Sequence, residues 1–149
     1  MNLISDPWLP AQLKSGTARK ISFADLADSD LVDINAPRPD FRGGIYQLLI
    51  GLLQLSMAPE DEDEWKGLYQ EPPSRDDLAK AFSPYQNAFE LEADGPAFMQ
   101  DLLLLKTVNL EPNQNSVRDL LIDAGSDSNL YFNKHKEDLA LCESCFAQA

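Results

Sequence analysis

Apolar residues recur at helical spacing between about residues 40 and 57, and this is the strongest structural signal in the chain. The apolar positions are Phe41, Ile45, Leu48, Leu49, Leu52, Leu53 and Leu55. A stripe this broad leaves little polar face on a helix. The pattern therefore predicts a helix from about Asp40 to Met57 that is buried on most sides and forms the centre of the core.

Two further helices are predicted from their start signals. Pro59 ends the first helix, and the run "EDEDEW" that follows places several acids in a first turn, where the helix dipole favours negative charge. We interpret these acids as a solvated helix start and not as a partner-binding patch. Ser74 has Asp77 three residues on, a close relative of the capping box, which predicts a helix beginning at Arg75.

The N-terminal region shows a strand pattern. Two short runs, Trp8–Leu13 and Arg19–Phe23, flank the turn "KSGT" and predict a hairpin in which Gly16 supplies a positive φ. Ser22 precedes "FADLAD" and predicts a short helix with a hydroxyl cap. A strand followed by a loop is expected in "FELEADGPAFMQDL", and a short helix in "SVRDLLIDAG". The fold class is therefore α+β, a helix-rich domain with a small N-terminal hairpin, taken as one domain over residues 1–149.

Charge and composition narrow the function classes. The 149 residues are 44% apolar, which is ordinary for a globular domain, and carry a formal charge of -13. So acidic a surface repels phosphate, which disfavours non-specific nucleic-acid binding by this chain alone. The N-terminus has no basic region followed by an apolar one, so a cytoplasmic location is expected. The apolar stretch Ile45–Ala58 is shorter than the ~20 residues of a membrane span, and no membrane contact is expected.

Cys142 and Cys145 are the only cysteines and form a Cys-x-x-Cys pair. Thiolates at this spacing on a tight turn can both bind one tetrahedral zinc ion, but a structural zinc site needs two more ligands. His135, the one histidine, lies at a spacing that fits none of the standard zinc fingers. A zinc half-site, a redox pair and two unremarkable thiols all remain open.

Catalytic motifs are absent from the sequence. A zinc deaminase would have Pro before the first cysteine of its pair, whereas Leu141 stands there. Nucleophile elbows, P-loops and dinucleotide fingerprints are missing as well. We therefore expect a protein that is not an enzyme.

The stretch "NLYFNKHK" is the one locally basic part of this acidic chain. It combines Tyr131, Phe132 and Asn133 with Lys134 and Lys136. Rings that stack on bases, an amide that reads a base edge and lysines that meet phosphate are the components of a small single-strand contact. The alternative is a strand end with its aromatic rings in the core and its lysines in solvent.

Five separated segments, in order, resemble the N-terminal part of the CasA family, the large subunit of the type I-E CRISPR Cascade complex. They are "MNLISDPWLP", "RPDFRGGIYQLLIGLLQLSMAPEDEDEW", "PAFMQD", "NLYFN" and "LCESC". Family members are much longer, so the resemblance implies an incomplete N-terminal domain of a larger, non-catalytic protein in antiviral defence. It implies other Cascade subunits, the guide RNA 5′ handle, target DNA within the complex and a helicase-nuclease as partners. The elements that read the target-adjacent motif would lie beyond Ala149.

The resemblance also assigns roles to residues. The family's aromatic-apolar-Asn motif, which anchors the subunit on the guide RNA 5′ handle, falls on Tyr131, Phe132 and Asn133, with the following lysines as phosphate neighbours. The family resembles a four-cysteine zinc protein, of which Cys142 and Cys145 would be the first pair and the second pair comes from much further along the chain. Two alternatives stay open: a stand-alone acidic thiol protein that uses the pair in redox exchange, and an acidic protein–protein adaptor.

Overall fold

The structure, a computed structural model, describes residues 1–95, 97–100 and 141–148. Strands β1 (Leu9–Leu13) and β2 (Ala18–Ile21) form the predicted antiparallel hairpin. Gly16 has a φ of 85° in the turn, so the prediction that it supplies a positive φ is confirmed. A strand that the sequence pattern did not predict, β3 (Leu31–Ile34), pairs antiparallel with the other edge of β1 and gives the order β2-β1-β3.

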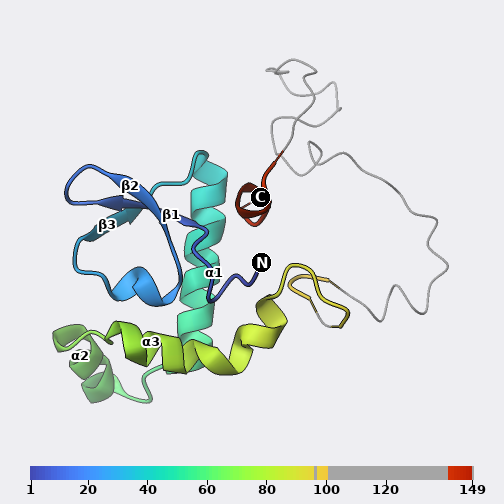
Figure 1. The fold of residues 1–149 in the computed structure, drawn as a ribbon. Coiled ribbons are helices and arrows are strands. Elements are labelled where there is room, and N and C mark those ends of the chain that lie inside the picture. The colour runs from blue at the N-terminus through green and yellow to red at the C-terminus, as the bar shows by residue number, and fades with distance from the viewer. Residues whose placement is uncertain (96, 101–140, 149) are drawn as a thin grey trace, which may run out of the picture.

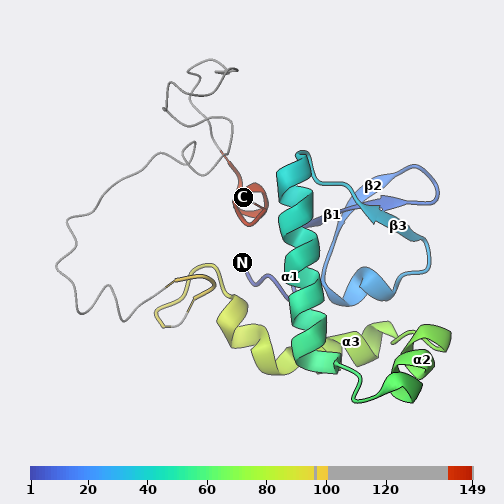
Figure 2. The same cartoon turned by 180° about the vertical axis from the view of Figure 1, so that it is seen from behind.

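Helices pack around this sheet (Figures 1 and 2). The helical elements are η1 (Ala24–Ala27), α1 (Pro39–Met57), α2 (Glu62–Gln70), α3 (Arg75–Phe82), η2 (Ser83–Phe89) and α5 (Glu143–Phe146), of which η1 and η2 are 3₁₀ helices. In Figure 1, α1 stands upright beside the sheet. Helix α3 lies near the lower end of α1, and α2 lies at the periphery. The α+β class predicted from the sequence is confirmed.

The three long helices begin where the sequence signals placed them. Asp61 is the N-cap of α2, and its carboxylate accepts a hydrogen bond from the Glu64 N–H at 2.8 Å. Ser74 and Asp77 form a complete capping box at the start of α3. The Asp77 N–H donates to the Ser74 hydroxyl at 3.2 Å, and the Ser74 N–H donates to the Asp77 carboxylate at 3.0 Å. These contacts satisfy backbone donors that an uncapped helix leaves unsatisfied.

Helix α1 is less buried than its sequence predicted. Phe41, Ile45, Leu49 and Leu52 are buried along one face. The opposite face is open, and Ile50 and Leu55 are 54% and 62% exposed. The prediction of burial on most sides is therefore wrong, because the described elements cover only one side of this helix.

The core lies where the sheet, η1, α3 and the buried face of α1 meet. Trp8, Phe23 and Phe82 are fully buried there. The rings of Trp8 and Phe23 lie 5.8 Å apart, and Phe23 meets Phe82 edge to face at 6.2 Å. The indole N–H of Trp8 donates to the backbone carbonyl of Leu3 at 2.6 Å, so the one polar atom of this buried side chain is satisfied.

The N-terminal segment is fastened to the region after η2 through the buried Asn2. Its side-chain amide donates to the Gln86 carbonyl at 2.9 Å and to the Glu90 carboxylate at 2.8 Å. Its side-chain oxygen accepts from the N–H groups of Ile4 and Ser5 at 3.0 and 3.2 Å. A single backbone bridge joins Asn2 to Glu90. The prediction of a strand in "FELEADG" is wrong, since only this bridge forms there.

The start of η1 also differs from the prediction. The element begins at Ala24, and the side chain of Ser22 does not act as a hydroxyl cap. Instead, the N–H and the hydroxyl of Ser22 both donate to the Asp25 carboxylate, at 2.9 and 2.7 Å. Arg75 of α3 donates to the other Asp25 oxygen at 2.8 Å, which ties η1 to α3. The helix predicted in "SVRDLLIDAG" lies outside the described residues.

Candidate functional site

The cysteine pair stands on the first turn of α5. Cys142 is the N-cap residue, and its carbonyl accepts hydrogen bonds from the N–H groups of Cys145 and Phe146, both at 2.9 Å. This turn brings the two sulfur atoms to 3.1 Å from each other. Cys142 is exposed and Cys145 is partly buried. Both sulfurs therefore lie on the same turn.

Burial and one side-chain contact hold α5 on the domain. Ser144 and Gln148 are 6% and 8% exposed, and the Gln148 amide donates to the Ser144 carbonyl at 2.8 Å. Ala147 packs against the core. From strand β2, the Lys20 ammonium donates to the Ser144 hydroxyl. The Cys-x-x-Cys turn is therefore held by a residue that lies more than a hundred positions earlier in the chain.

The pair's surroundings separate the two thiols electrostatically. The Ser144 hydroxyl lies 3.4 Å from the Cys142 sulfur. Hydrogen bonds with Ser144, with the Cys145 side chain and with the Cys145 N–H, together with the positive charge of Lys20, lower the pKa of Cys142 to about 7. The hydrogen bond to Cys142 and partial burial raise the pKa of Cys145. As the pH rises, Cys142 therefore ionises before Cys145.

The geometry fits half of a tetrahedral zinc site. Two sulfurs bound to one zinc ion at about 2.3 Å stand about 3.8 Å apart, so a small rotation of the Cys142 and Cys145 side chains from their present 3.1 Å suffices. Within residues 1–95, 97–100 and 141–148, no three His, Cys, Asp or Glu side chains are grouped as a metal site. In that part of the chain, the pair supplies two ligands without a third.

The structure does not test the predicted RNA-binding residues. Tyr131, Phe132, Asn133, Lys134 and Lys136 lie outside the described residues. Their proposed contact with the guide RNA stays a prediction.

Of the helices that the structure describes, none has the length and apolar character needed to cross a membrane.

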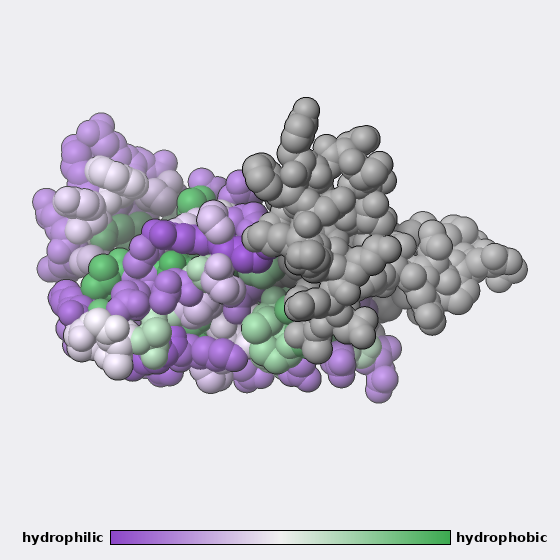
Figure 3. Space-filling model, turned by 90° about the horizontal axis from the view of Figure 1, so that it is seen from above, coloured by the Kyte–Doolittle hydropathy of each residue, from purple (hydrophilic) through white to green (hydrophobic). Residues whose placement is uncertain are grey.

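Other features of the surface were not predicted. Lys20 and Ser144 have no sequence signal that links them, because their contact joins two distant segments. Trp65 and Tyr69 stack on the outer surface of α2 with ring centroids 5.9 Å apart. Their spacing of four residues on a predicted helix was a visible signal for this pair. Seen from above, most of the described surface is hydrophilic, with separate hydrophobic patches between (Figure 3).

Comparison with known proteins places this architecture in a family context. The profile of the family described as CRISPR-associated protein Cse1 matches residues 2–149. The structure is similar to Cse1 from Thermobifida fusca, at 28% identity and a TM-score of 0.59 over 67% of this chain and 20% of that one. It is also similar to Cse1 from Acidimicrobium ferrooxidans, at 24% identity and a TM-score of 0.61 over 68% of this chain and 21% of that one.

A third solved relative shares the fold at lower identity. CasA (Cse1) from Thermus thermophilus is 19% identical, with a TM-score of 0.66 over 81% of this chain and 26% of that one. The matched part of this chain thus corresponds to about a fifth to a quarter of the length of these solved proteins.

Proposed function

Because this chain belongs to the CRISPR-associated protein Cse1 family, we propose that it forms a non-catalytic, N-terminal part of the large subunit of a type I-E Cascade complex, which uses a guide RNA in antiviral defence. The observation that carries this proposal is the family match, which extends over residues 2–149. The shared fold supports it. The intact subunit would support recognition of the target-adjacent motif, DNA binding and recruitment of a helicase-nuclease.

We propose that Tyr131, Phe132 and Asn133 contact the 5′ handle of the guide RNA, with Lys134 and Lys136 beside the phosphates. The net charge of -13 is consistent with a subunit that binds mainly to protein partners and contacts the RNA at one place. An acidic chain gains little affinity from phosphate contacts, so protein partners would hold the subunit in place while one local contact reads the RNA. Ring stacking would contribute about 1–3 kcal/mol per base.

Co-assembly with purified Cascade subunits and guide RNA tests this proposal. We expect the chain to be retained in the complex, and Tyr131→Ala or Asn133→Ala to weaken retention when the guide RNA is present. Asn87→Ala, at an exposed asparagine of η2, is the matched control and should leave retention unchanged. Retention that is independent of both the RNA and Asn133 would favour an acidic protein–protein adaptor. Failure to co-assemble at all would contradict membership of the complex.

We further propose that Cys142 and Cys145 provide the first pair of thiolates for a structural zinc ion. Such an ion would tie distant parts of the subunit together. Cobalt(II), which gives visible thiolate charge-transfer bands, tests the site when a peptide carrying a second Cys-x-x-Cys pair is added to the chain. The bands should form with the natural chain and not with Cys142→Ser. Bands of equal intensity in both proteins would exclude these ligands.

Redox exchange is the second candidate for the same pair. It is favoured by the 3.1 Å separation of the sulfurs and by the lowered pKa of Cys142. Equilibration in glutathione buffers of graded potential, followed by thiol counting, distinguishes the candidates. A redox pair would form a reversible disulfide within the buffered range without metal. A structural zinc pair would bind metal and resist oxidation while the metal is bound.

A further inference from the structure

Helix α2 is the least anchored long helix of the described structure. None of its residues is buried, and only Leu68 is half-buried. Its two aromatic side chains nevertheless lie stacked in parallel, with an angle of 12° between the ring planes. Trp65 is 56% exposed and Tyr69 is 77% exposed. Exposed aromatic side chains that contribute nothing buried to the core are typical of a binding interface.

These rings line a hollow between α2 and the end of α1. The hollow has a volume of about 290 Å³, and Leu53, Met57 and Pro73 complete its apolar wall. Met57 and Pro73 also line a larger groove of about 990 Å³ between the end of α1, α2 and α3. The apolar hollow and the groove are therefore neighbouring parts of one surface, which we call the α2 groove.

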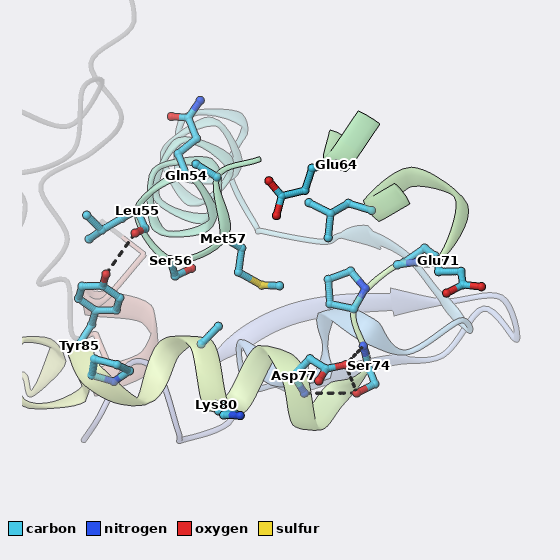
Figure 4. Close-up of a pocket in the computed structure, with 16 residues that line it drawn as sticks. Gln54, Leu55, Ser56, Met57, Glu64, Glu71, Ser74, Asp77, Lys80 and Tyr85 are labelled. Atoms are coloured by element: carbon cyan, nitrogen blue, oxygen red, sulfur yellow. Dashed lines mark hydrogen bonds between the residues drawn. The ribbon is translucent and has the colours of Figure 1, made fainter. Parts of the chain in front are cut away.

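Acidic residues dominate the rim of the α2 groove. Its charged lining residues are the carboxylates Glu64, Glu71 and Asp77 and, on the α3 side, the cation Lys80. Beside the groove on α2, Lys66 is paired with Glu62 at 2.9 Å and with Asp63 at 3.7 Å. Glu64 and Glu71 lie on the α2 side of the groove, and Met57 extends into it from α1 (Figure 4). The surface thus offers carboxylates beside exposed aromatic faces.

This combination selects the chemistry of the occupant. Carboxylates repel a nucleic-acid backbone, and they attract lysine and arginine side chains. Guanidinium and ammonium groups also bind the faces of tryptophan and tyrosine rings. An apolar hollow beside the rings accepts an aliphatic side chain. We propose that the α2 groove docks a basic, amphipathic segment of a partner protein, with cationic side chains over Trp65 and Tyr69 and an apolar side chain in the hollow.

The proposal does not depend on the RNA contact proposed above and is tested separately. The probe is a fluorescein-labelled amphipathic peptide with arginine and leucine on opposite faces, and its anisotropy is measured against the full chain. We expect saturable binding that weakens as salt rises, because the carboxylate contacts are screened. A charge-reversed peptide with glutamate for arginine and a single-stranded RNA should not bind.

Variants locate the peptide on this surface. Trp65→Ala combined with Tyr69→Ala should lower the affinity about tenfold or more, which corresponds to about 1.4 kcal/mol. Val32→Ala is the matched control, since Val32 is an equally exposed apolar side chain, at 61%, on strand β3. A second pair of changes, Glu64→Gln with Glu71→Gln, removes charge and keeps the rings; it should reduce the salt dependence as well as the affinity.

Three outcomes would overturn the proposal. One is equal binding by the natural chain and the aromatic double variant, and another is binding of the RNA or the charge-reversed peptide in place of the basic one. The third concerns a longer Cse1 chain that contains this segment. Trp8 is fully buried, so acrylamide quenching of the present chain reports on Trp65. If the longer chain shields Trp65 from acrylamide, the groove is filled within the subunit and not by a partner.

Discussion

Two aromatic clusters in this molecule lie in opposite environments. Trp8, Phe23 and Phe82 are fully buried between the sheet, η1 and α3. Trp65 and Tyr69 stack at a similar distance from each other and remain mostly exposed. The first cluster holds elements from three parts of the chain together, whereas the second rests on a single helix. Contact between rings therefore does not indicate a contribution to stability; burial against other elements does.

The largest effect should come from opening the buried cluster. Trp8→Ala removes a fully buried indole and its hydrogen bond to the Leu3 carbonyl. We expect a loss of about 3–5 kcal/mol in the free energy of unfolding, because a cavity remains at the centre of the core. Urea unfolding monitored by circular dichroism measures it. A loss below about 1 kcal/mol would show that the N-terminal core is not what stabilises the domain.

Asn2 tests whether the buried side of the comparison also depends on polar contacts. Asn2→Ala removes the amide that bonds Gln86 and Glu90 and leaves two N–H groups without their acceptor. The expected loss is about 1–3 kcal/mol, which is the cost of unsatisfied buried polar groups. The same urea titration applies, with Asn87→Ala as an exposed control. Equal stability of the two variants would contradict the role assigned to Asn2.

Ser74 lies between the two regions, at the start of the helix that follows α2. Ser74→Ala removes the side-chain half of the capping box of α3. We expect a loss of about 1 kcal/mol. Ser74→Asp should restore most of it, since aspartate is an equally good N-cap, and thermal unfolding of the three proteins provides the measurement. If Ser74→Asp were no better than Ser74→Ala, the cap would not be the source of the effect.

Asp25, which joins η1 to α3 beside the buried cluster, makes the stability of the fold depend on pH. Burial alone would raise its pKa, but hydrogen bonds from Arg75 and Ser22 lower it to about 2, from 3.8. The folded state therefore binds its proton less readily, so the stabilisation is complete above about pH 4 and is lost as the pH falls toward 2. Because Arg75 is 64% exposed, we expect no more than about 1 kcal/mol. Asp25→Asn should flatten this part of the stability–pH curve; an unchanged curve would contradict the assignment.

The smallest effect is expected at the exposed cluster. Trp65→Ala should change the free energy of unfolding by less than about 0.5 kcal/mol, since the ring is 56% exposed and α2 contributes no buried residue. Set beside Trp8→Ala, it compares the same substitution in the two environments. A loss of more than about 2 kcal/mol would mean that α2 is a structural support and would remove the main reason for treating its rings as an interface.

Local signals in the sequence predicted much of this fold. Gly16 in the hairpin turn, the Ser74–Asp77 capping box and the acidic start of α2 each act within a few residues, and the structure confirms all three. Features that depend on neighbours in sequence can be read without knowing the tertiary structure.

Features that depend on distant partners were missed. Strand β3 is half-exposed and short, and it becomes a strand only because β1 offers a free edge. The apolar residues of α1 are evenly spread, so the sequence did not reveal that Ile50 and Leu55 would face away from the other described elements. The contact of Lys20 with Ser144 joins the second strand to α5, and no local pattern announces it.

The hydrogen bonds of Asn2 with Gln86 and Glu90 have a consequence for synthesis on the ribosome. Strands β1 and β2, which pair with each other, are made within a few residues of each other. The partners of Asn2, Gln86 and Glu90, are made 84 and 88 residues after it. At about 5–20 residues per second, the first residues stay without these partners for roughly 4–18 s. During that interval, Leu3 and Ile4, both buried in the finished fold, are exposed on the nascent chain. The earliest segment to be made is thus among the last to be fastened.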